Sequence, residues 1–354
     1  MTAVILIKNG MVFLKCRTPS CHAPLAVTNI SFGEFDLFSN ENYYFCRKIK
    51  QVEEQKSKYI SNIEIKGLWG RYDVNWKLNS DVNILVGENG TGKSTILKLV
   101  YTYLKWSSTL LNRFMFEAET KQGLILRKSN SLKIQFNDKD SIETIYNPET
   151  GFNKILKSSL FYLNISLITT FDSISEISEL DKKFSTELNT ELDFYLQKEI
   201  VNFISYQLDL SKKIINKKQD VDIVFAKRKY FIQIVNHLFS KTGKILDENE
   251  NGITFLLGDK QIKTYELSSG EKQLLLILLT VLNQDEKPSI LLMDEPEISL
   301  HLRWQYELIE ILRTLNPNCQ LIIATHSPSI FNHGWRDKVF WIEDIVKEKE
   351  AVHE

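Results

Sequence analysis

Apolar residues follow two different spacings along the chain, and each spacing predicts one kind of element. Short, nearly continuous apolar runs are typical of strands buried on both faces, and they occur at 82–86, 290–293 and 320–324. Apolar steps of three and four residues predict helices over 94–104, 273–282 and 306–315. The alternation of the two kinds predicts an α/β core built on a parallel sheet.

A segment with a different pattern lies between the two halves of this core. Alternation over 123–136 predicts a hairpin, and apolar positions over 176–239 predict a long helical zone. A second hairpin is predicted from strands at 253–257 and 261–265. The expected organisation is an aromatic-rich N-terminal extension over 1–57, a core formed by 58–110 and 260–354, and a mainly helical insertion, a lid or arm, over 111–259.

Composition places the chain among ordinary folded proteins. Its 354 residues are 43% hydrophobic and 25% charged, with 14 Gly and 7 Pro, which excludes collagen-like and mostly disordered proteins. The 44 basic and 45 acidic residues leave a formal charge of −1. Any contact with nucleic acid must therefore come from a local patch and not from the charge of the whole molecule.

The cysteines and the apolar runs bear on the cellular compartment. Cys16, Cys21, Cys46 and Cys319 are too few for a disulfide framework and favour a reducing compartment. Cys16 and Cys21 beside His22 make a zinc site conceivable, but ordinary free thiols fit better because no second tight pair completes a tetrahedron. The apolar runs are too short for a signal segment or a membrane span, so the sequence predicts a cytoplasmic protein without membrane contact.

A glycine-rich loop stands between a predicted strand and a predicted helix. Residues 87–94 fit the pattern G-x-x-x-x-G-K-[ST] at every fixed position. The glycines allow backbone N–H groups to point at phosphate oxygens above the positive end of the helix. We expect Lys93 to reach the β- and γ-phosphates and the Ser94 hydroxyl to bind Mg²⁺. The expected nucleotide-binding residues here are Gly87, Glu88, Asn89, Gly90, Thr91, Gly92, Lys93, Ser94 and Thr95.

Two carboxylates follow the strand predicted at 290–293. A buried parallel strand delivers Asp294 and Glu295 to the carboxyl edge of the sheet, where the ligands of such sheets bind. We expect Asp294 to hold Mg²⁺, directly or through water, and Glu295 to position and polarise the attacking water. An Asp-Glu pair alone is usually a solvated turn, so its weight comes from its occurrence together with the phosphate loop.

Two further short motifs narrow the class. Ser268, Ser269 and Gly270 precede a predicted helix and form a second cradle for an anion. Two phosphate cradles in one chain indicate that one of them serves a nucleotide held mainly by another subunit. His326 follows the strand predicted at 320–324, where it can hydrogen-bond the γ-phosphate and respond to its loss. A lone histidine is more often a structural donor, but its position after the acidic strand favours the sensor role.

The order of the four motifs resembles the ABC-type ATPase heads of the SMC, RecF and OLD group. The resemblance covers roughly 58–105 and 260–345. It implies a P-loop NTPase fold of the ABC-ATPase type and a head-to-head dimer. Two ATP molecules would then lie between the phosphate loop of one subunit and the signature motif of the other, which the resemblance places at 267–273. The resemblance also gives Lys93, Glu295 and His326 catalytic roles and places at 297–301 the D-loop, which crosses the interface.

Departures from the family distinguish its branches. A transporter subunit carries the same motifs, but 175 residues separate Lys93 from Ser268, more than in compact transporter heads. The insertion lacks the sustained heptads of an SMC coiled coil. An OLD-type nuclease domain is not expected, because 28 residues follow His326. The chain therefore resembles the ATPase subunits of bacterial anti-phage systems of the Septu and PARIS type, in which a separate nuclease or toxin does the damage.

Three groups of residues are weaker candidates. Residues 169–172 stand where the family has a glutamine-bearing loop, but they lack the glutamine. Trp69, Arg71 and Tyr72 could stack on adenine or ribose, and core packing explains them equally well. A basic cluster could contact DNA or RNA, and a solvated helix face is an equally good interpretation. The cluster comprises Lys212, Lys213, Lys217, Lys218, Lys227, Arg228 and Lys229.

Three hypotheses of function follow. The first is an ATP-hydrolysing dimeric switch that gates a nuclease or toxin partner in anti-phage defence, with ATP and Mg²⁺ as cofactors. The second is a RecF- or SMC-like ATPase of DNA repair or chromosome maintenance that clamps DNA directly. The third is a scaffold that binds ATP without hydrolysis, against which Glu295 argues.

Overall fold

A computed structural model divides the chain into two units, Met1–Gln55 and Lys56–Glu354. The first unit ends close to the limit expected for the N-terminal extension. It contains a four-stranded antiparallel sheet in the order β1 (Ala3–Lys8), β2 (Met11–Cys16), β4 (Tyr43–Cys46), β3 (Leu37–Asn40). The structure describes residues 3–8, 11–16, 37–40, 43–46, 58–108, 129–138, 140–146, 153–157, 163–169, 190–217, 220–248, 250 and 252–349.

A five-stranded parallel sheet is the centre of the second unit. Its order is β11 (Asn164–Ile168), β15 (Ser289–Asp294), β16 (Cys319–Thr325), β7 (Val82–Val86), β17 (Val339–Trp341). The strands predicted at 82–86, 290–293 and 320–324 are therefore confirmed, and they lie next to one another or one strand apart. Every pairing in this sheet is parallel, so the carboxyl ends of all five strands lie at one edge.

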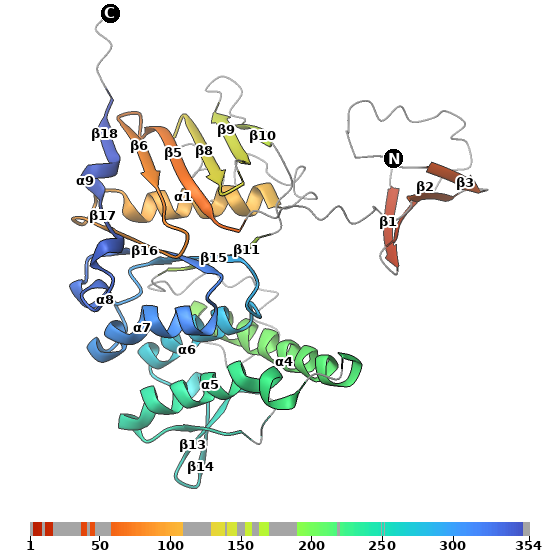
Figure 1. Ribbon diagram of the computed structural model, residues 1–354, viewed down its shortest axis with the longest axis vertical. Helices are drawn as coiled ribbons and strands as arrows, with labels where there is room; N and C mark the ends of the chain where they lie inside the picture. Colours follow the sequence, from red (N-terminus) through yellow and green to blue (C-terminus); the bar gives the residue numbers. More distant parts are fainter. Residues whose placement is uncertain are drawn as a thin grey trace, which may run out of the picture. The chain divides into compact units, whose positions relative to one another are not determined.

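Side chains of the central strands alternate between two apolar cores. In β15, Leu291 and Met293 pack against the helical layer, whereas Ile290 and Leu292 face helix α1 (Lys93–Ser108). Burial on both faces explains why the sequence of this strand is continuously apolar. Figure 1 shows the resulting layers, with α1 between the parallel sheet and a second sheet, and with α6 (Ser269–Leu282) and α7 (Leu302–Leu315) on the opposite face.

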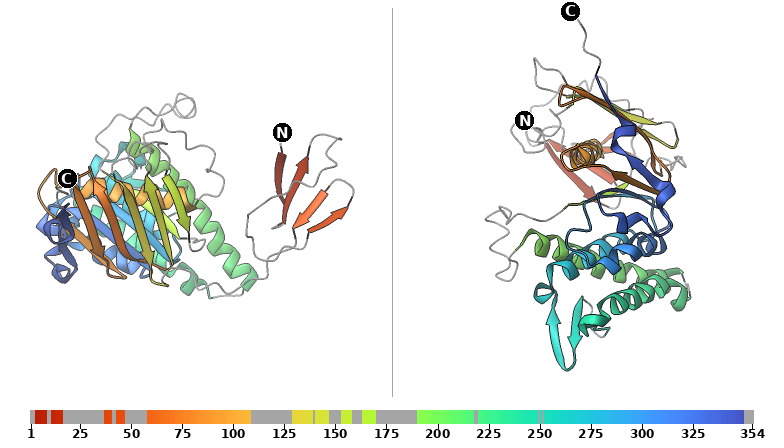
Figure 2. Two further views of the ribbon diagram at one scale, coloured as in Figure 1. Left: turned by 90° about the horizontal axis from the view of Figure 1, so that it is seen from above. Right: turned by 90° about the vertical axis from the view of Figure 1, so that its left-hand side faces the viewer.

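The second sheet has six strands and covers α1. Its order is β10 (Asn153–Lys157), β9 (Ser141–Tyr146), β8 (Ser131–Phe136), β5 (Ile60–Leu68), β6 (Tyr72–Lys77), β18 (Val346–Glu348). All its pairings are antiparallel, and the strands lie side by side in the left view of Figure 2. The sheet joins strands that precede the phosphate loop in the sequence with strands that follow it.

The strand pairing in the insertion differs from the expectation in two respects. The hairpin predicted over 123–136 is wrong in its pairing, because β8 forms its hairpin with the following strand β9 and also pairs with β5. Residues 123–128 lie outside the described residues. The segment 111–259 is also not wholly separate from the head, since β8, β9, β10 and β11 belong to the two sheets of the head. Long-range strand pairing, which apolar spacing does not encode, causes both differences.

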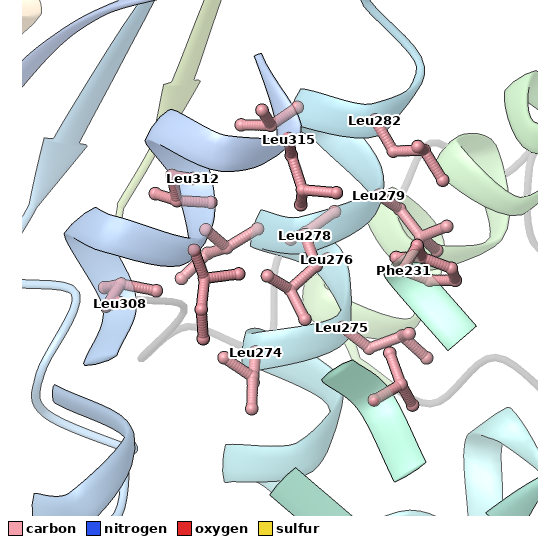
Figure 3. Close-up of a cluster of buried hydrophobic side chains, with 14 of the residues drawn as sticks. Phe231, Leu274, Leu275, Leu276, Leu278, Leu279, Leu282, Leu308, Leu312 and Leu315 are labelled. Atoms are coloured by element: carbon pink, nitrogen blue, oxygen red, sulfur yellow. The ribbon is translucent and has the colours of Figure 1, made fainter. Parts of the chain in front are cut away.

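Helices cover the other face of the parallel sheet. They are α4 (Glu191–Lys217), α5 (Val221–Phe239), α6 (Ser269–Leu282) and α7 (Leu302–Leu315). Helix α6 is buried along almost its whole length, and Figure 3 shows its leucines packed between α7 and Phe231 of α5. Removing one such leucine side chain costs about 2–5 kcal/mol in a well-packed core. This packing fixes the position of the signature motif at the beginning of α6.

The remaining elements are short. The predicted second hairpin is confirmed as β13 (Thr254–Leu257) and β14 (Lys260–Lys263), which form a three-stranded sheet with β12 (Ile245–Leu246). Single turns complete the described part of the fold: α8 (Pro328–Phe331), α9 (Ile342–Ile345), η2 (Ser240–Thr242), η3 (Thr264–Glu266) and η4 (Arg336–Lys338).

Candidate active site

Three loops with candidate chemistry meet at the carboxyl edge of the parallel sheet. Val86 lies opposite Thr325 in the register of β7 and β16, and Ala324 lies opposite Asp294 in the register of β16 and β15. The phosphate loop, the acidic pair and the histidine therefore leave neighbouring strands at the same level. This agrees with the edge at which ligands of parallel sheets bind.

The phosphate loop has the backbone that its glycines were expected to permit. Gly90 has φ +81° and Gly92 has φ +105°, in the region that side-chain-bearing residues avoid. The Thr91 hydroxyl donates a 2.7 Å hydrogen bond to the carbonyl of Glu88 and closes the loop. Helix α1 begins at Lys93, near the end of the motif, and has no acidic residue in its first turn. The positive helix end is therefore available to an anion.

The amine of Lys93 lies across the loop. Its Nζ donates to the carbonyl oxygens of Gly87 and Glu88, at 2.9 and 2.8 Å, and the residue is only 4% exposed. These two acceptors hold the charge at the loop where phosphate oxygens are expected. An arriving phosphate group is a stronger acceptor than a carbonyl and would replace these bonds.

Ser94 and Asp294 provide the oxygen atoms of a candidate cation site. The Ser94 hydroxyl donates a 2.8 Å hydrogen bond to Oδ1 of Asp294, and Nζ of Lys98 lies 3.8 Å from Oδ2. Burial raises the pKa of Asp294 above its ordinary value, while the Ser94 hydroxyl and the Lys98 ammonium oppose the rise. A hydroxyl and a carboxylate are ligands that Mg²⁺ prefers, so this donor set fits that ion.

Glu295 and His326 face each other at the same edge. The backbone of Glu295 has φ +48°, which is strained for a residue with a side chain, and its N–H donates to the carbonyl of Ala324. Oε1 of Glu295 lies 3.4 Å from Nδ1 of His326. The imidazole is about half exposed, so it can reach a group bound above the sheet edge.

The signature motif caps helix α6. The Ser268 hydroxyl accepts a hydrogen bond from the N–H of Glu271, and Oε2 of Glu271 accepts the backbone N–H of Ser268, which together form a capping box. Glu271 in turn makes a 2.8 Å ion pair with Lys244. Ser268 and Ser269 are both exposed. The beginning of α6 is thus rigid and presents Ser269 at the surface.

The signature motif packs directly on the expected D-loop. A Cβ at Gly270 would lie 2.2 Å from the carbonyl oxygen of Ser299, so only glycine fits at this position. The side chain of Gln273 also donates to the carbonyl of Pro296 at 3.2 Å. At the end of the loop, Nδ1 of His301 accepts the N–H of Arg303 at the start of α7. The structure therefore brings the signature, the D-loop and the acidic strand into one contiguous region.

One of the three candidate adenine contacts reaches the phosphate loop. A Cβ at Gly92 would lie 2.6 Å from the ring of Trp69, so the indole lies directly against the loop. The indole is 41% exposed and meets Tyr72 edge to face, with 6.3 Å between ring centroids. Arg71 lies over the Tyr72 ring and pairs with Glu348 at 3.1 Å. These contacts put Trp69 at the site without assigning it a ligand.

Other candidates lie away from the site or outside the described residues. Thr169 follows β11 next to the acidic strand, but 170–172 lie outside the described residues, so the glutamine-loop assignment stays a prediction. The described parts of the chain hold no group of three metal-ligating side chains. Cys21 is among the residues not described, and Cys319 is buried in β16, where burial raises its pKa to about 11. None of the described helices is long and apolar enough to cross a membrane.

Acidic or amide partners occupy most of the basic cluster. Each of four lysines has a carboxylate within 3.2 Å, and Arg228 donates to the side chain of Gln207. Lys218 lies outside the described residues. Pairing of this kind lowers the positive charge that the surface can offer to a phosphate backbone. The four ion-paired lysines are Lys212, Lys213, Lys227 and Lys229.

Lys98 and the contacts of Glu297 with the histidine turn were not predicted from the sequence. Lys98 lies four positions after Ser94, so the helical repeat puts both on one face of α1, and this signal was available. The carboxylate of Glu297 accepts hydrogen bonds from Thr325 and from the N–H of His326. No local sequence pattern predicts these contacts, because the partners lie 28 and 29 positions apart in the chain.

Comparisons with known proteins show the family and the fold of the chain. Residues 82–332, more than half of the chain, match the family described as "AAA domain, putative AbiEii toxin, Type IV TA system". The solved "SmcHead bound to the C-winged helix domain of ScpA" has a similar fold, with a TM-score of 0.51 and 16% identity over 82% of this chain and 97% of that chain. That likeness concerns the fold alone.

Two curated bacterial proteins are also similar in sequence. The "Retron Vc95 probable ATPase" of Vibrio cholerae serotype O1 biovar El Tor is 26% identical over 227 residues, which cover 60% of this chain and 43% of that protein. The "Septu protein PtuA" of Bacillus mycoides (strain KBAB4) is 21% identical over 348 residues, 91% of this chain and 44% of that protein. The chain thus spans less than half the length of these two relatives.

Proposed function

The chain belongs to this AAA domain family and has the fold of an ABC-type ATPase head, and from this premise we propose that it is an ATP-hydrolysing dimeric switch. The observation that carries the proposal is the convergence of three loops at one sheet edge. Five candidate residues lie there. Lys93 contacts its own loop, Ser94 donates a hydrogen bond to Asp294, and Glu295 faces His326. The name of the retron relative, a probable ATPase, supports the same reaction.

The residues of the sheet edge divide the work of phosphoryl transfer to water. Backbone N–H groups of 87–94 and the amine of Lys93 neutralise the phosphate oxygens. Ser94 and Asp294 would hold Mg²⁺, which supplies charge neutralisation between the β- and γ-phosphates. Glu295 accepts hydrogen bonds from the attacking water, and His326 contacts the γ-phosphate and loses that contact after hydrolysis.

The second half of each site comes from another copy of the chain. Ser269 is exposed at the positive end of α6, where an anion from outside the chain can bind. Two heads that face each other would place Ser269 of one copy against the γ-phosphate held by the other. ATP then closes the dimer and hydrolysis opens it, so nucleotide state sets the distance between the two heads.

The dimer is proposed to gate a separately encoded nuclease or toxin in anti-phage defence. Similarity to a Septu protein and to a retron ATPase supports this assignment. Direct clamping of DNA has less support, because each of the four ion-paired lysines of the basic cluster already has a carboxylate partner. Binding of ATP as a structural ligand without turnover is the remaining alternative, and the position of Glu295 opposite His326 argues against it.

Phosphate release by the purified chain tests the proposed reaction. We expect turnover of ATP with Mg²⁺ and a loss of at least about 100-fold in Glu295→Gln, because that change removes the group that orients water. Equal, slow turnover in both proteins would contradict catalysis by this site. Gating is tested in cells by deletion of the gene for the proposed partner: loss of phage protection supports gating, and unchanged protection contradicts it.

A further inference from the structure

Buried hydrogen bonds hold the D-loop on two sides. On one side, Gln273 of α6 donates to the carbonyl of Pro296 at 3.2 Å. On the other, Nε2 of Gln305 donates to the carbonyls of Glu297 and Leu300, at 3.3 and 2.9 Å. These bonds tie the backbone of the loop to both the signature helix and α7.

The carboxylate of Glu297 points from this loop into the turn that carries the histidine. Its Oε1 accepts the hydroxyl of Thr325 and the backbone N–H of His326, the latter at 3.2 Å. The Thr325 hydroxyl accepts the N–H of Ser327 at 2.9 Å and continues the network. A second contact, from the Ser327 hydroxyl to Gln305, joins the same turn to α7. The shape of the histidine turn thus depends on Glu297.

The imidazole of His326 has two carboxylates on the same nitrogen. Nδ1 lies 3.4 Å from Oε1 of Glu295 and 3.7 Å from Oε1 of Glu297. Two acceptors near Nδ1 favour the tautomer that carries hydrogen there. In the neutral imidazole the other ring nitrogen, Nε2, then carries no hydrogen, so a contact with a phosphate oxygen, which only accepts hydrogen bonds, requires a second proton on the ring.

Retention of a carboxylate in this place is costly for folding. Glu297 is only 6% exposed, and its Oε2 is buried without a hydrogen-bond partner among the described residues. A buried polar atom without a partner lowers the stability of the fold. Buried unsatisfied groups of this kind point to a function other than stability.

We propose that Glu297 is a positioning residue for hydrolysis, which fixes the turn and tautomer of His326 and connects both to the signature helix. The inference rests on the proposed ATPase function, but not on any contact of Glu297 with the nucleotide. Its action requires a hydrogen-bond acceptor at Oε1 and does not require the negative charge. A glutamine whose carbonyl takes the place of Oε1 accepts the same two bonds, whereas alanine accepts neither.

Three variants of the full chain test this role. Glu297→Ala should lower kcat about 10- to 100-fold, as expected for a misplaced catalytic group, with the affinity for a non-hydrolysable ATP analogue unchanged within about threefold. Glu297→Gln should retain kcat within about fivefold, since it keeps the acceptor. Gln284→Ala is the matched control, because Gln284 is also buried with one unpartnered atom but lies in a separate network with Asn316 and Ser289. It should lower Tm and leave kcat near that of the parent.

A direct readout of the imidazole separates this inference from the proposed function. In ¹⁵N-histidine-labelled protein, with the signal assigned through His326→Asn, the parent and Glu297→Gln should show the Nδ1–H tautomer and Glu297→Ala a mixture. This result supports the role even if the parent has no turnover, in which case only the ATPase proposal fails. An unchanged tautomer in Glu297→Ala overturns the role of Glu297. Parental kcat in that variant, or parallel losses of kcat and Tm in Glu297→Ala and Gln284→Ala, also overturns it.

Discussion

Replacement of Gly270 by alanine tests the contact between the signature motif and the D-loop. The added Cβ would lie 2.2 Å from the carbonyl oxygen of Ser299. Favourable contact begins near 3.5 Å, so α6 and the D-loop must separate by about 1 Å. Overpacking of this kind costs about 1–3 kcal/mol. Alanine is also the better helix former by about 1 kcal/mol, so without the clash the change would raise stability.

The expected consequence for catalysis is larger than that for stability. A displacement of about 1 Å in a supporting loop can lower turnover about 100-fold. We therefore expect Gly270→Ala to lose about 100-fold in kcat, with a Tm equal to or below that of the parent. Binding of ATP by the phosphate loop should change little, because 87–94 follow β7, which is not adjacent to β15 in the sheet.

Steady-state phosphate release, calorimetric melting and nucleotide titration measure these three quantities. Gly252→Ala is the matched control, since a Cβ at Gly252 has open space around it and should leave kcat unchanged. Parental kcat together with a raised Tm in Gly270→Ala would refute the reasoning. That result would mean that the D-loop yields freely and that its contact with α6 does not position the site.

Three further changes probe single residues of the sheet edge. Lys93→Ala should weaken ATP binding at least about 100-fold in a titration, because the charge held across the loop is lost; parental affinity would contradict this role. Glu295→Gln should bind ATP and accumulate as a dimer in light scattering, and a monomer at saturating ATP would count against a hydrolysis-driven opening. Asp294→Asn should raise Tm at neutral pH and abolish Mg²⁺-dependent turnover. The sign follows from the raised pKa of Asp294: its folded-state pKa lies above the unfolded value, so the ionised group destabilises the fold at every pH above that range. The gain in Tm should therefore shrink as the pH falls through the folded pKa, and a lower Tm at neutral pH would contradict the argument.

The local parts of the fold could be predicted from the sequence because their causes are local. Glycines at fixed spacing between an apolar run and an amphipathic segment predicted the loop at 87–94, and the structure has the positive φ angles that this loop needs. The common edge of Asp294 and His326 followed from the rule that parallel strands end together. The roles of these residues in binding and catalysis stay predictions.

Contacts between distant segments could not be predicted in this way. Ile63 precedes the phosphate loop in the sequence and pairs with Ile134, which follows it. Apolar spacing does not say which strands pair, so β8–β11 were assigned to the insertion. The position of Trp69 on Gly92 and the bond from Thr325 to Glu297 likewise depend on the folded chain. The ion pairs of the basic cluster show the same limit, because four lysines find carboxylates that a linear count of charges does not connect.

A mixture of two inactive variants tests most directly whether two copies share each nucleotide. Lys93→Ala removes the phosphate loop's charge, and Ser269→Arg blocks the exposed end of α6 in the partner's site. In a symmetric dimer each variant alone lacks both composite sites, but a mixed dimer has one intact site, built from Ser269 of one copy and Lys93 of the other. We expect recovery to about a quarter of parental turnover on equal mixing, because about half of the dimers are mixed and each mixed dimer has one intact site of two. A mixture that stays as inactive as its components, although Ser269→Arg is folded and binds ATP, would contradict it.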